Sequence, residues 1–560
     1  MSSRKKKSGL KSAAGKNFLV QGSILAIASI LAKIIGMVYR IPLTNILGDS
    51  GNSYYSTANE IYSIILMVSS FSVPLALSKM MSERINRGEY RNANKVFRCA
   101  MRFSVVSGAV MAILTYLLAG IITRYVMNFE LAKYGLRVIA PAILIFAITG
   151  TFRGYFQGFG NMVPTAVSQI IEQIVNAVLS VVCAALMFRY GEKLAAENGN
   201  SQLGPAWGAA GGTFGTVGSV TIALIFMMIV YQISRTNFRR QMASDPPRRL
   251  ESSQRIYHEL LATIIPIVLS TVVYNISTVM DQGIFNAVLK SQGYSEEQYS
   301  IIWGIYVGKY RVLMNVVLSL ASSLGPAIVP SMTAAIASRD KKKAIRNISS
   351  AIRITMIFCI PCAFGLAALG GPIISMLFHP TSGMPLSIGI MKAGAVMIIL
   401  YSLSTLTTSI LQGMDKMKEP LYHNVIALII HVVCIVVFLR VLNLNIYAVI
   451  AANTVFALVV CVLNAHTIRV VLKGYRQEVY KTFFIPTVAS IIMAFVSYGV
   501  YNLFHHFIGV TLPCILAILV GMFVYLYVLV AFHGIEVREI QTMPHGQAIL
   551  RICRKLYILR

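Results

Sequence analysis

Charged residues are scarce in this 560-residue chain, and acidic residues are the scarcest. Only 12% of the residues are charged, with 20 Asp and Glu against 49 Lys and Arg, whereas a soluble domain carries roughly 25%. The chain also lacks polar segments long enough for a soluble catalytic domain, and it contains neither HExxH nor GxSxG. The composition therefore excludes an ordinary soluble protein, and an enzyme is not expected.

Long apolar runs recur from one end of the chain to the other. Each is about 20 residues long, which suffices to cross a hydrocarbon core of about 30 Å as a helix. The first run continues to Leu47, too far for the core of a cleaved signal peptide. We predict an all-α polytopic membrane protein with 14 transmembrane helices. The predicted spans are 18–46, 54–78, 103–123, 138–158, 163–188, 206–231, 260–285, 304–330, 354–378, 388–412, 421–439, 446–468, 482–504 and 511–532.

The net charge of +29 comes from basic residues that are unevenly distributed along the chain. They gather in alternate loops, the pattern of the positive-inside rule, which predicts that both termini are cytoplasmic. No basic face is interleaved with aromatic residues that could stack on bases, so we expect no nucleic-acid binding.

An internal repeat relates two parts of the chain. The triplet 156–158 and the following Pro164 recur as 411–413 and Pro420, about 255 residues later. The basic loop 87–91 recurs as 339–343, after 252 residues. Repeats of this kind are common in transporters. They predict an N-terminal lobe over 1–245 with spans one to six, a C-terminal lobe over 246–475 with spans seven to twelve, and two additional spans with a basic cytoplasmic tail over 476–560.

Ionisable residues inside the predicted spans are few and fall on polar helical faces. Each costs at least about 2.5 kcal/mol on insertion scales, so such residues usually face a cavity or a partner. Polar residues at helical spacing mark four spans and predict a hydrated cleft between the lobes. The four polar stripes are Ser29, Lys33, Gly36 and Arg40; Gln169, Glu172, Asn176 and Ser180; Ser270, Tyr274, Ser277 and Asp281; and Arg311, Asn315, Ser319 and Ser322.

Two interpretations of these charges remain open. In the functional one, the cations attract an anionic headgroup, because guanidinium and ammonium groups bind phosphate oxygens. The carboxylates then gate the empty state or couple transport to a cation. In the structural one, each charge pairs with another and holds helices together. The candidate headgroup residues are Lys33, Arg40, Lys309 and Arg311, and the candidate coupling or gating residues are Glu60, Glu172 and Asp281.

Two further patterns are interpreted as packing features. Gly212, Gly215 and Gly218 recur every three residues within a span, which favours close helix contact. Cys359 and Cys362 form a CxxC inside an apolar run without a second pair, so we expect buried thiols and no metal site.

Three segments resemble the multidrug/oligosaccharidyl-lipid/polysaccharide exporter superfamily, in the branch of polysaccharide biosynthesis proteins, stage V sporulation protein B and lipid II flippases. They are 32–43, 73–79 and 152–173. The similarity extends over nearly the whole chain. The positions that match the family's motifs include Arg153, Gln157, Gln169 and Asn176.

The resemblance implies a flippase of the bacterial cytoplasmic membrane. It would move an undecaprenyl-diphosphate-linked glycan, a peptidoglycan or polysaccharide precursor, to the outer leaflet by alternating access of two lobes. Lys33 and Arg40 match cavity cations of lipid II flippases, although the family often has arginine where Lys33 stands. The last two spans would form a groove for the lipid tail.

Partners and driving force follow from the same resemblance. We expect the lipid-linked sugar, membrane lipids and cell-wall synthesis enzymes as partners, and no cofactor beyond a coupling cation (H⁺ or Na⁺) or the membrane potential. The alternative function is a cation-coupled multidrug antiporter on the same fold, with Asp281 or Glu172 as its ion site. An excess of cationic residues in the cleft argues against a cationic substrate.

Overall fold

The computed structural model describes residues 24–534 except 26, 71, 244, 246–249, 320, 323–331, 333–335, 337, 339, 380–382, 417 and 533. Several predicted features lie outside the described residues: the basic N-terminal tail, the linker prolines at 246–247, Arg339 of the repeat, the end of the eighth span and the C-terminal tail. The side chains of Ser270 and Tyr274, in the third polar stripe, also lie outside them.

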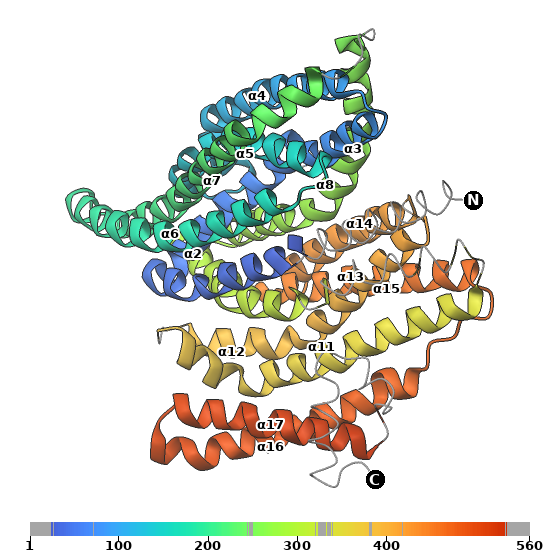
Figure 1. Ribbon diagram of the computed structural model, residues 1–560. Helices are drawn as coiled ribbons and strands as arrows, with labels where there is room; N and C mark the ends of the chain where they lie inside the picture. Colours follow the sequence, from blue (N-terminus) through green and yellow to red (C-terminus); the bar gives the residue numbers. More distant parts are fainter. Residues whose placement is uncertain are drawn as a thin grey trace. The chain divides into compact units, whose positions relative to one another are not determined.

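The described chain is helical throughout and forms two compact units, Met1–Gly304 and Ile305–Arg560 (Figure 1). A short apolar helix, Ile27–Val38, precedes the labelled elements of the first unit. These are α2 (Arg40–Ser69), α3 (Val73–Asn86), α4 (Tyr90–Ile121), the π-turn η1 (Ile122–Val126), the 3₁₀ turn η2 (Glu130–Ala132), α5 (Lys133–Gly158), α6 (Val163–Asn198), α7 (Leu203–Ala243), α8 (Ser253–Ser291) and α9 (Glu296–Ile305).

The second unit continues with a π-turn and a set of long helices. They are η3 (Tyr306–Tyr310), α11 (Lys341–Leu377), α12 (Met384–Ala393), α13 (Ala395–Gly413), α14 (Lys418–Arg440), α15 (Ile446–Val471), the π-turn η4 (Tyr480–Phe484), α16 (Ile485–Ile508) and α17 (Thr511–Ala531). The described residues include no strand, and twelve of their helices are long and apolar enough to cross a membrane. The all-α polytopic fold is therefore confirmed, while the count of fourteen stays a prediction.

Helix boundaries follow local chemistry. Proline occupies the first turn of α3, α6 and α16, where its missing N–H costs no hydrogen bond. The hydroxyl of Ser252 accepts the backbone N–H of Arg255 and caps α8, and the Asp340 carboxylate accepts the N–H of Lys343 to cap α11. Gly48 breaks the helical path inside α2 with φ 65° and ψ −175°, between the first two predicted spans.

The first unit is held together by an apolar core near the start of α4 and by close packing of α6 on α7. The core joins α3, α4, α5, α7 and α8, with Phe97, Tyr155 and Phe238 among its buried members. A Cβ added at Gly215 would overlap the backbone of Ser180 on α6. The glycine spacing therefore marks a helix contact, as the sequence predicts.

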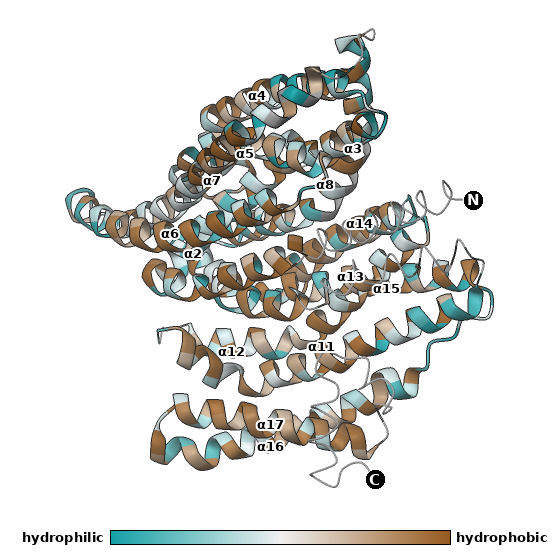
Figure 2. Ribbon diagram, in the orientation of Figure 1, coloured by the Kyte–Doolittle hydropathy of each residue, from teal (hydrophilic) through white to brown (hydrophobic). Residues whose placement is uncertain are grey.

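The second unit packs around α11. One core joins α11, α13 and α15, and another joins α11 to α16 and α17. Hydrophobic residues dominate α16 and α17 (Figure 2). Cys359 and Cys362 are free thiols within α11, Cys359 buried and Cys362 half-buried. The contact units divide at Gly304, whereas the repeat divides the sequence near residue 245; the lobe boundaries stay a prediction.

Candidate functional site

Polar residues of the first span, α2, α5 and α6 meet in the first unit and are called the polar layer here. The break at Gly48 sets the path of α2 beside this layer. The buried Asn52 amide donates to the Gly48 carbonyl at 2.7 Å and to the Thr44 carbonyl at 3.2 Å, which satisfies backbone acceptors exposed by the break. These hydrogen bonds fix the two parts of α2 relative to each other, so that Arg40, before the break, contacts Tyr55, after it.

Arg40 lies over an aromatic ring with part of its hydrogen-bonding capacity unused. Its guanidinium carbon is 4.7 Å from the centroid of the Tyr55 ring, a cation–π contact. One terminal nitrogen, Nη1, is buried and has no hydrogen-bond partner within the described structure. A buried cationic donor of this kind is costly to leave unsatisfied, so it is poised to bind an anionic oxygen.

The polar stripe of α6 contacts residues of the first predicted span. Asn176 donates to the Tyr39 hydroxyl at 3.1 Å, and Tyr39 lies 3.4 Å from the Tyr55 hydroxyl. Ser180 donates to Asn176 at 2.9 Å, while Ser29 donates to the Gln169 side-chain oxygen at 3.3 Å. The hydrogen bonds connect the Arg40–Tyr55 pair to the centre of α6.

Arg153 and Glu172 form a buried ion pair at 2.7 Å, with side-chain exposures of 8% and 15%. Arg153 also donates to the Ser168 hydroxyl at 2.9 Å. This geometry ties the end of α5 to the first turns of α6, which is the structural interpretation of both charges. This pairing was not predicted from the sequence, in which Arg153 is marked as a family-motif position and Glu172 as a candidate coupling group.

The remaining candidates occupy different environments. Glu60 accepts from the Ser56 hydroxyl at 3.2 Å on α2. Lys33 is exposed on the short first helix, Gln157 is half-buried at the end of α5, and Asp281 is buried on α8 in the first unit. In the second unit, Lys309 is buried within η3 and Arg311 is half-buried just after it. The structure places these residues, but their roles stay predictions.

A charged cluster that the sequence analysis missed anchors α8 to the first unit. The buried Arg84 of α3 donates to Glu251 at 2.6 Å and to Glu259 at 2.7 Å. Lys95 donates to the Glu251 carbonyl, and the backbone N–H of Glu251 donates to Asn92 at 3.1 Å. The chain before α8 is therefore clamped against α3 and α4.

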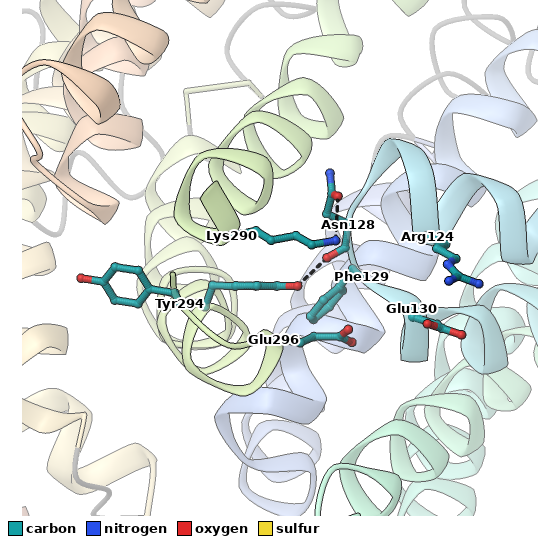
Figure 3. Close-up of a pocket in the computed structure, with 8 residues that line it drawn as sticks. Arg124, Asn128, Phe129, Glu130, Lys290, Tyr294 and Glu296 are labelled. Atoms are coloured by element: carbon teal, nitrogen blue, oxygen red, sulfur yellow. Dashed lines mark hydrogen bonds between the residues drawn. The ribbon is translucent and has the colours of Figure 1, made fainter. Parts of the chain in front are cut away.

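The far end of α8 is also held by the first unit. Gln282 donates to the Thr57 hydroxyl at 2.6 Å, and Asn286 donates to the Met127 carbonyl at 2.8 Å. Beside this contact lies a cavity of about 250 Å³. In Figure 3, Lys290 points to Asn128 on one side of the cavity, and Arg124 and Glu130 lie on the other. Its walls carry both signs of charge, so it has no clear preference for anions or cations.

Within the described residues, no group of three or more His, Cys, Asp or Glu side chains is arranged to hold a metal ion. The described contacts of the polar layer involve the Arg40 cation, tyrosine and serine hydroxyls, amides and the Arg153–Glu172 ion pair. Such a layer is suited to binding and reorienting a charged group.

The family comparisons agree with this picture. The model of the polysaccharide biosynthesis protein family matches residues 18–336, more than half of the chain, and the MatE family model matches residues 309–437. Lipid II flippase MurJ of Bacillus subtilis is 24% identical over 428 residues, covering 74% of this chain and 76% of that protein. Stage V sporulation protein B of the same organism is 21% identical, covering 96% and 100%.

A solved structure agrees on the fold. The inward closed conformation of lipid II flippase MurJ superposes with a TM-score of 0.64 at 16% identity, covering 91% of this chain and 98% of that one. The twelve apolar helices and these relatives make the chain a multi-pass membrane protein and a transporter, not an enzyme. The chain belongs to the polysaccharide biosynthesis protein family, within the multidrug/oligosaccharidyl-lipid/polysaccharide exporter superfamily.

Proposed function

We propose that the chain flips an undecaprenyl-diphosphate-linked glycan, a peptidoglycan or polysaccharide precursor, from the cytoplasmic to the outer leaflet by alternating access. It would reside in a bacterial cytoplasmic membrane with both termini inside. The named relatives support this substrate class, because one is a lipid II flippase and another acts in sporulation. A coupling cation or the membrane potential would drive the cycle.

Arg40 is the observation that carries the proposal. It is a half-buried cation with a buried, unused N–H, and no carboxylate of the described chain forms an ion pair with it. A diphosphate supplies several anionic oxygens, and guanidinium matches their geometry. Tyr55 and Tyr39 add hydroxyls on the same side, so the layer offers both charge and neutral hydrogen bonds.

Complementation of a flippase-depleted strain tests this role. We expect Arg40→Ala to lose about 10- to 150-fold in flipping rate, the equivalent of about 1.5–3 kcal/mol for a hydrogen bond to a charged group. Arg40→Lys should keep part of the activity. Flipping of a fluorescent polyprenyl-diphosphate glycan in proteoliposomes gives the rate directly.

Arg137 provides a matched control, because its guanidinium also lies over a tyrosine ring, that of Tyr116, at 5.8 Å but on an exposed surface. Arg137→Ala should complement fully and insert normally. If Arg40→Ala complemented as well as Arg137→Ala at equal membrane abundance, the headgroup role of Arg40 would be wrong.

The MatE match over 309–437 favours a second candidate, a cation-coupled multidrug antiporter. Glu172 is paired with Arg153, and Asp281 is the second buried carboxylate that the sequence marks as a candidate ion site for that function. Expression in an efflux-deficient strain distinguishes the two. Resistance to organic cations that Asp281→Asn abolishes would support the antiporter, and flipping without resistance supports the flippase.

A further inference from the structure

One face of α4 is uncovered along nearly its whole length. Only 17% of its most apolar stretch is buried. Exposed apolar residues follow one another along this face, with Val106 at 63%, Ile113 at 59% and Leu117 at 64% exposure. Arg98 and Arg102 stand on the same side of the helix, one and two turns before that apolar ribbon, and both are exposed.

The internal repeat shows that this face is unusual. Helices α5 and α13 end at Gly158 and Gly413, a separation of 255 residues. The basic loops directly before α4 and α11 recur after 252 residues and pair these two helices; the corresponding stretch of α11 is 39% buried. The difference arises because α11 is covered by α16 and α17, and α4 has no such cover among the described helices.

The covered face of α11 corresponds residue by residue to the uncovered face of α4. Arg353 donates to the Gly534 carbonyl after α17 at 2.7 Å, and Tyr525 of α17 donates to the Ile357 carbonyl at 2.7 Å. With the 252-residue separation of the loops that precede the two helices, Ile357 corresponds to Val105. Leu369, which packs against α16 and α17, corresponds to Leu117, and both of these α4 residues are exposed. Positions that are covered in one copy are thus left facing outward in the other.

Arg98 and Arg102 lie one helical turn apart on α4. Among the described residues, no carboxylate forms an ion pair with Arg98 or Arg102. Like charges four residues apart on a helix repel each other, so an anion bound between them would stabilise the pair. Tyr257 of α8 flanks this position, because it lies near Cys99 and within the electrostatic reach of Arg102.

The arrangement matches the shape of a membrane phospholipid. From Arg102 to Leu117 the helix rises about 22 Å, more than the roughly 15 Å hydrocarbon depth of one leaflet. Acyl chains can therefore lie along the apolar ribbon while the phosphate meets the arginines. We propose that this face of α4 binds an anionic phospholipid, of the phosphatidylglycerol class, in place of the two helices that cover α11.

Charge favours a lipid over a second copy of the chain. Two copies in one membrane have the same orientation, so a two-fold dimer through this face would bring Arg98 and Arg102 of each copy toward those of the other. The site is also separate from Arg40, which lies on α2. The lipid would thus be a bound component of the protein and not its transported substrate.

Native mass spectrometry of the full-length protein, purified in detergent with added phosphatidylglycerol or phosphatidylcholine, tests the proposal. The wild-type chain should retain phosphatidylglycerol and not phosphatidylcholine. Arg98→Gln with Arg102→Gln should weaken retention about 30-fold, because each basic residue near a membrane surface strengthens the binding of an anionic lipid about 5-fold. Arg98→Lys with Arg102→Lys should retain most of the lipid, which separates lost charge from misfolding.

Lys342→Gln with Arg346→Gln is the matched control. Both residues are exposed near the start of α11, and the double change removes the same two charges. It should leave the retained phosphatidylglycerol unchanged. The readout counts bound lipid and needs no flipping activity, so its result does not depend on the proposed function.

Four results would overturn the proposal. The first is equal retention of phosphatidylglycerol by the Arg98→Gln/Arg102→Gln variant and by its Lys342→Gln/Arg346→Gln control. The second is equal retention of phosphatidylcholine and phosphatidylglycerol by the wild type. The third is displacement of the bound lipid by undecaprenyl phosphate, which would assign the face to the transported substrate. A change of subunit number in Arg98→Gln with Arg102→Gln, without loss of lipid, would assign it to a second copy instead.

Discussion

Removing one partner of the Arg153–Glu172 ion pair should destabilise the protein far more than removing both partners. The two side chains are only 8% and 15% exposed, and their charged atoms lie 2.7 Å apart. Glu172→Leu leaves a buried guanidinium with only Ser168 as a side-chain partner, and Arg153→Met leaves a buried carboxylate. Each single change should cost about 3–5 kcal/mol, the range for breaking a buried pair.

The double variant should behave differently, because it removes both buried charges. Replacement of a buried pair by apolar residues of similar volume is often neutral or stabilising. We therefore expect Arg153→Met with Glu172→Leu to cost under about 2 kcal/mol, which gives a coupling energy of at least about 4 kcal/mol between the two sites. Unfolding in mixed detergent micelles, followed by circular dichroism, measures all four proteins.

A double variant whose cost equals the sum of the two single costs would refute this reasoning. The same cycle also tests the coupling role of Glu172. If the double variant regains stability but not flipping, Glu172 has a function beyond its ion pair. If it regains both, the carboxylate is a structural group, and the sequence-based coupling role is wrong.

Three further predictions concern backbone and anchoring. Gly215→Ala should destabilise by about 1–3 kcal/mol or more through overlap with α6, whereas Gly499→Ala, with open space around it, should be tolerated; unfolding midpoints compare them. Gly48→Ala should cost about 1–3 kcal/mol, because φ 65° with ψ −175° is a region that essentially only glycine adopts, and unchanged stability would contradict this. Arg84→Gln should release the segment before α8, seen as faster hydrogen exchange around Glu251, while exchange in α17 stays as in the wild type.

The sequence predicts the membrane class and most span positions well, because both depend on local composition. Apolar length fixes where helices lie, and the glycine spacing correctly indicates a helix contact at Gly215. Helical periodicity also places Gln169 and Asn176 on one face of α6, although the contact of that face with the first span depends on packing. These features need only neighbours within one or two turns of a helix.

The missed features all depend on contacts between distant segments. Arg84 meets Glu251 across 167 residues, and neither residue lies in a predicted span. The π-turn at Tyr306–Tyr310 changes the helical register beneath Lys309, so spacing alone cannot place that side chain. The partner of Glu172 is likewise set by how α5 packs on α6, which a single sequence does not specify.

The anchoring of α8 has a consequence for how the chain is made. Its holding residues Arg84, Asn92 and Thr57 are synthesised before the helix they hold, and Met127 precedes it as well. A ribosome that has just completed Ser291 has therefore already produced every residue of this docking surface. The helices of the first unit that precede α8 can therefore bind it before α11 is synthesised.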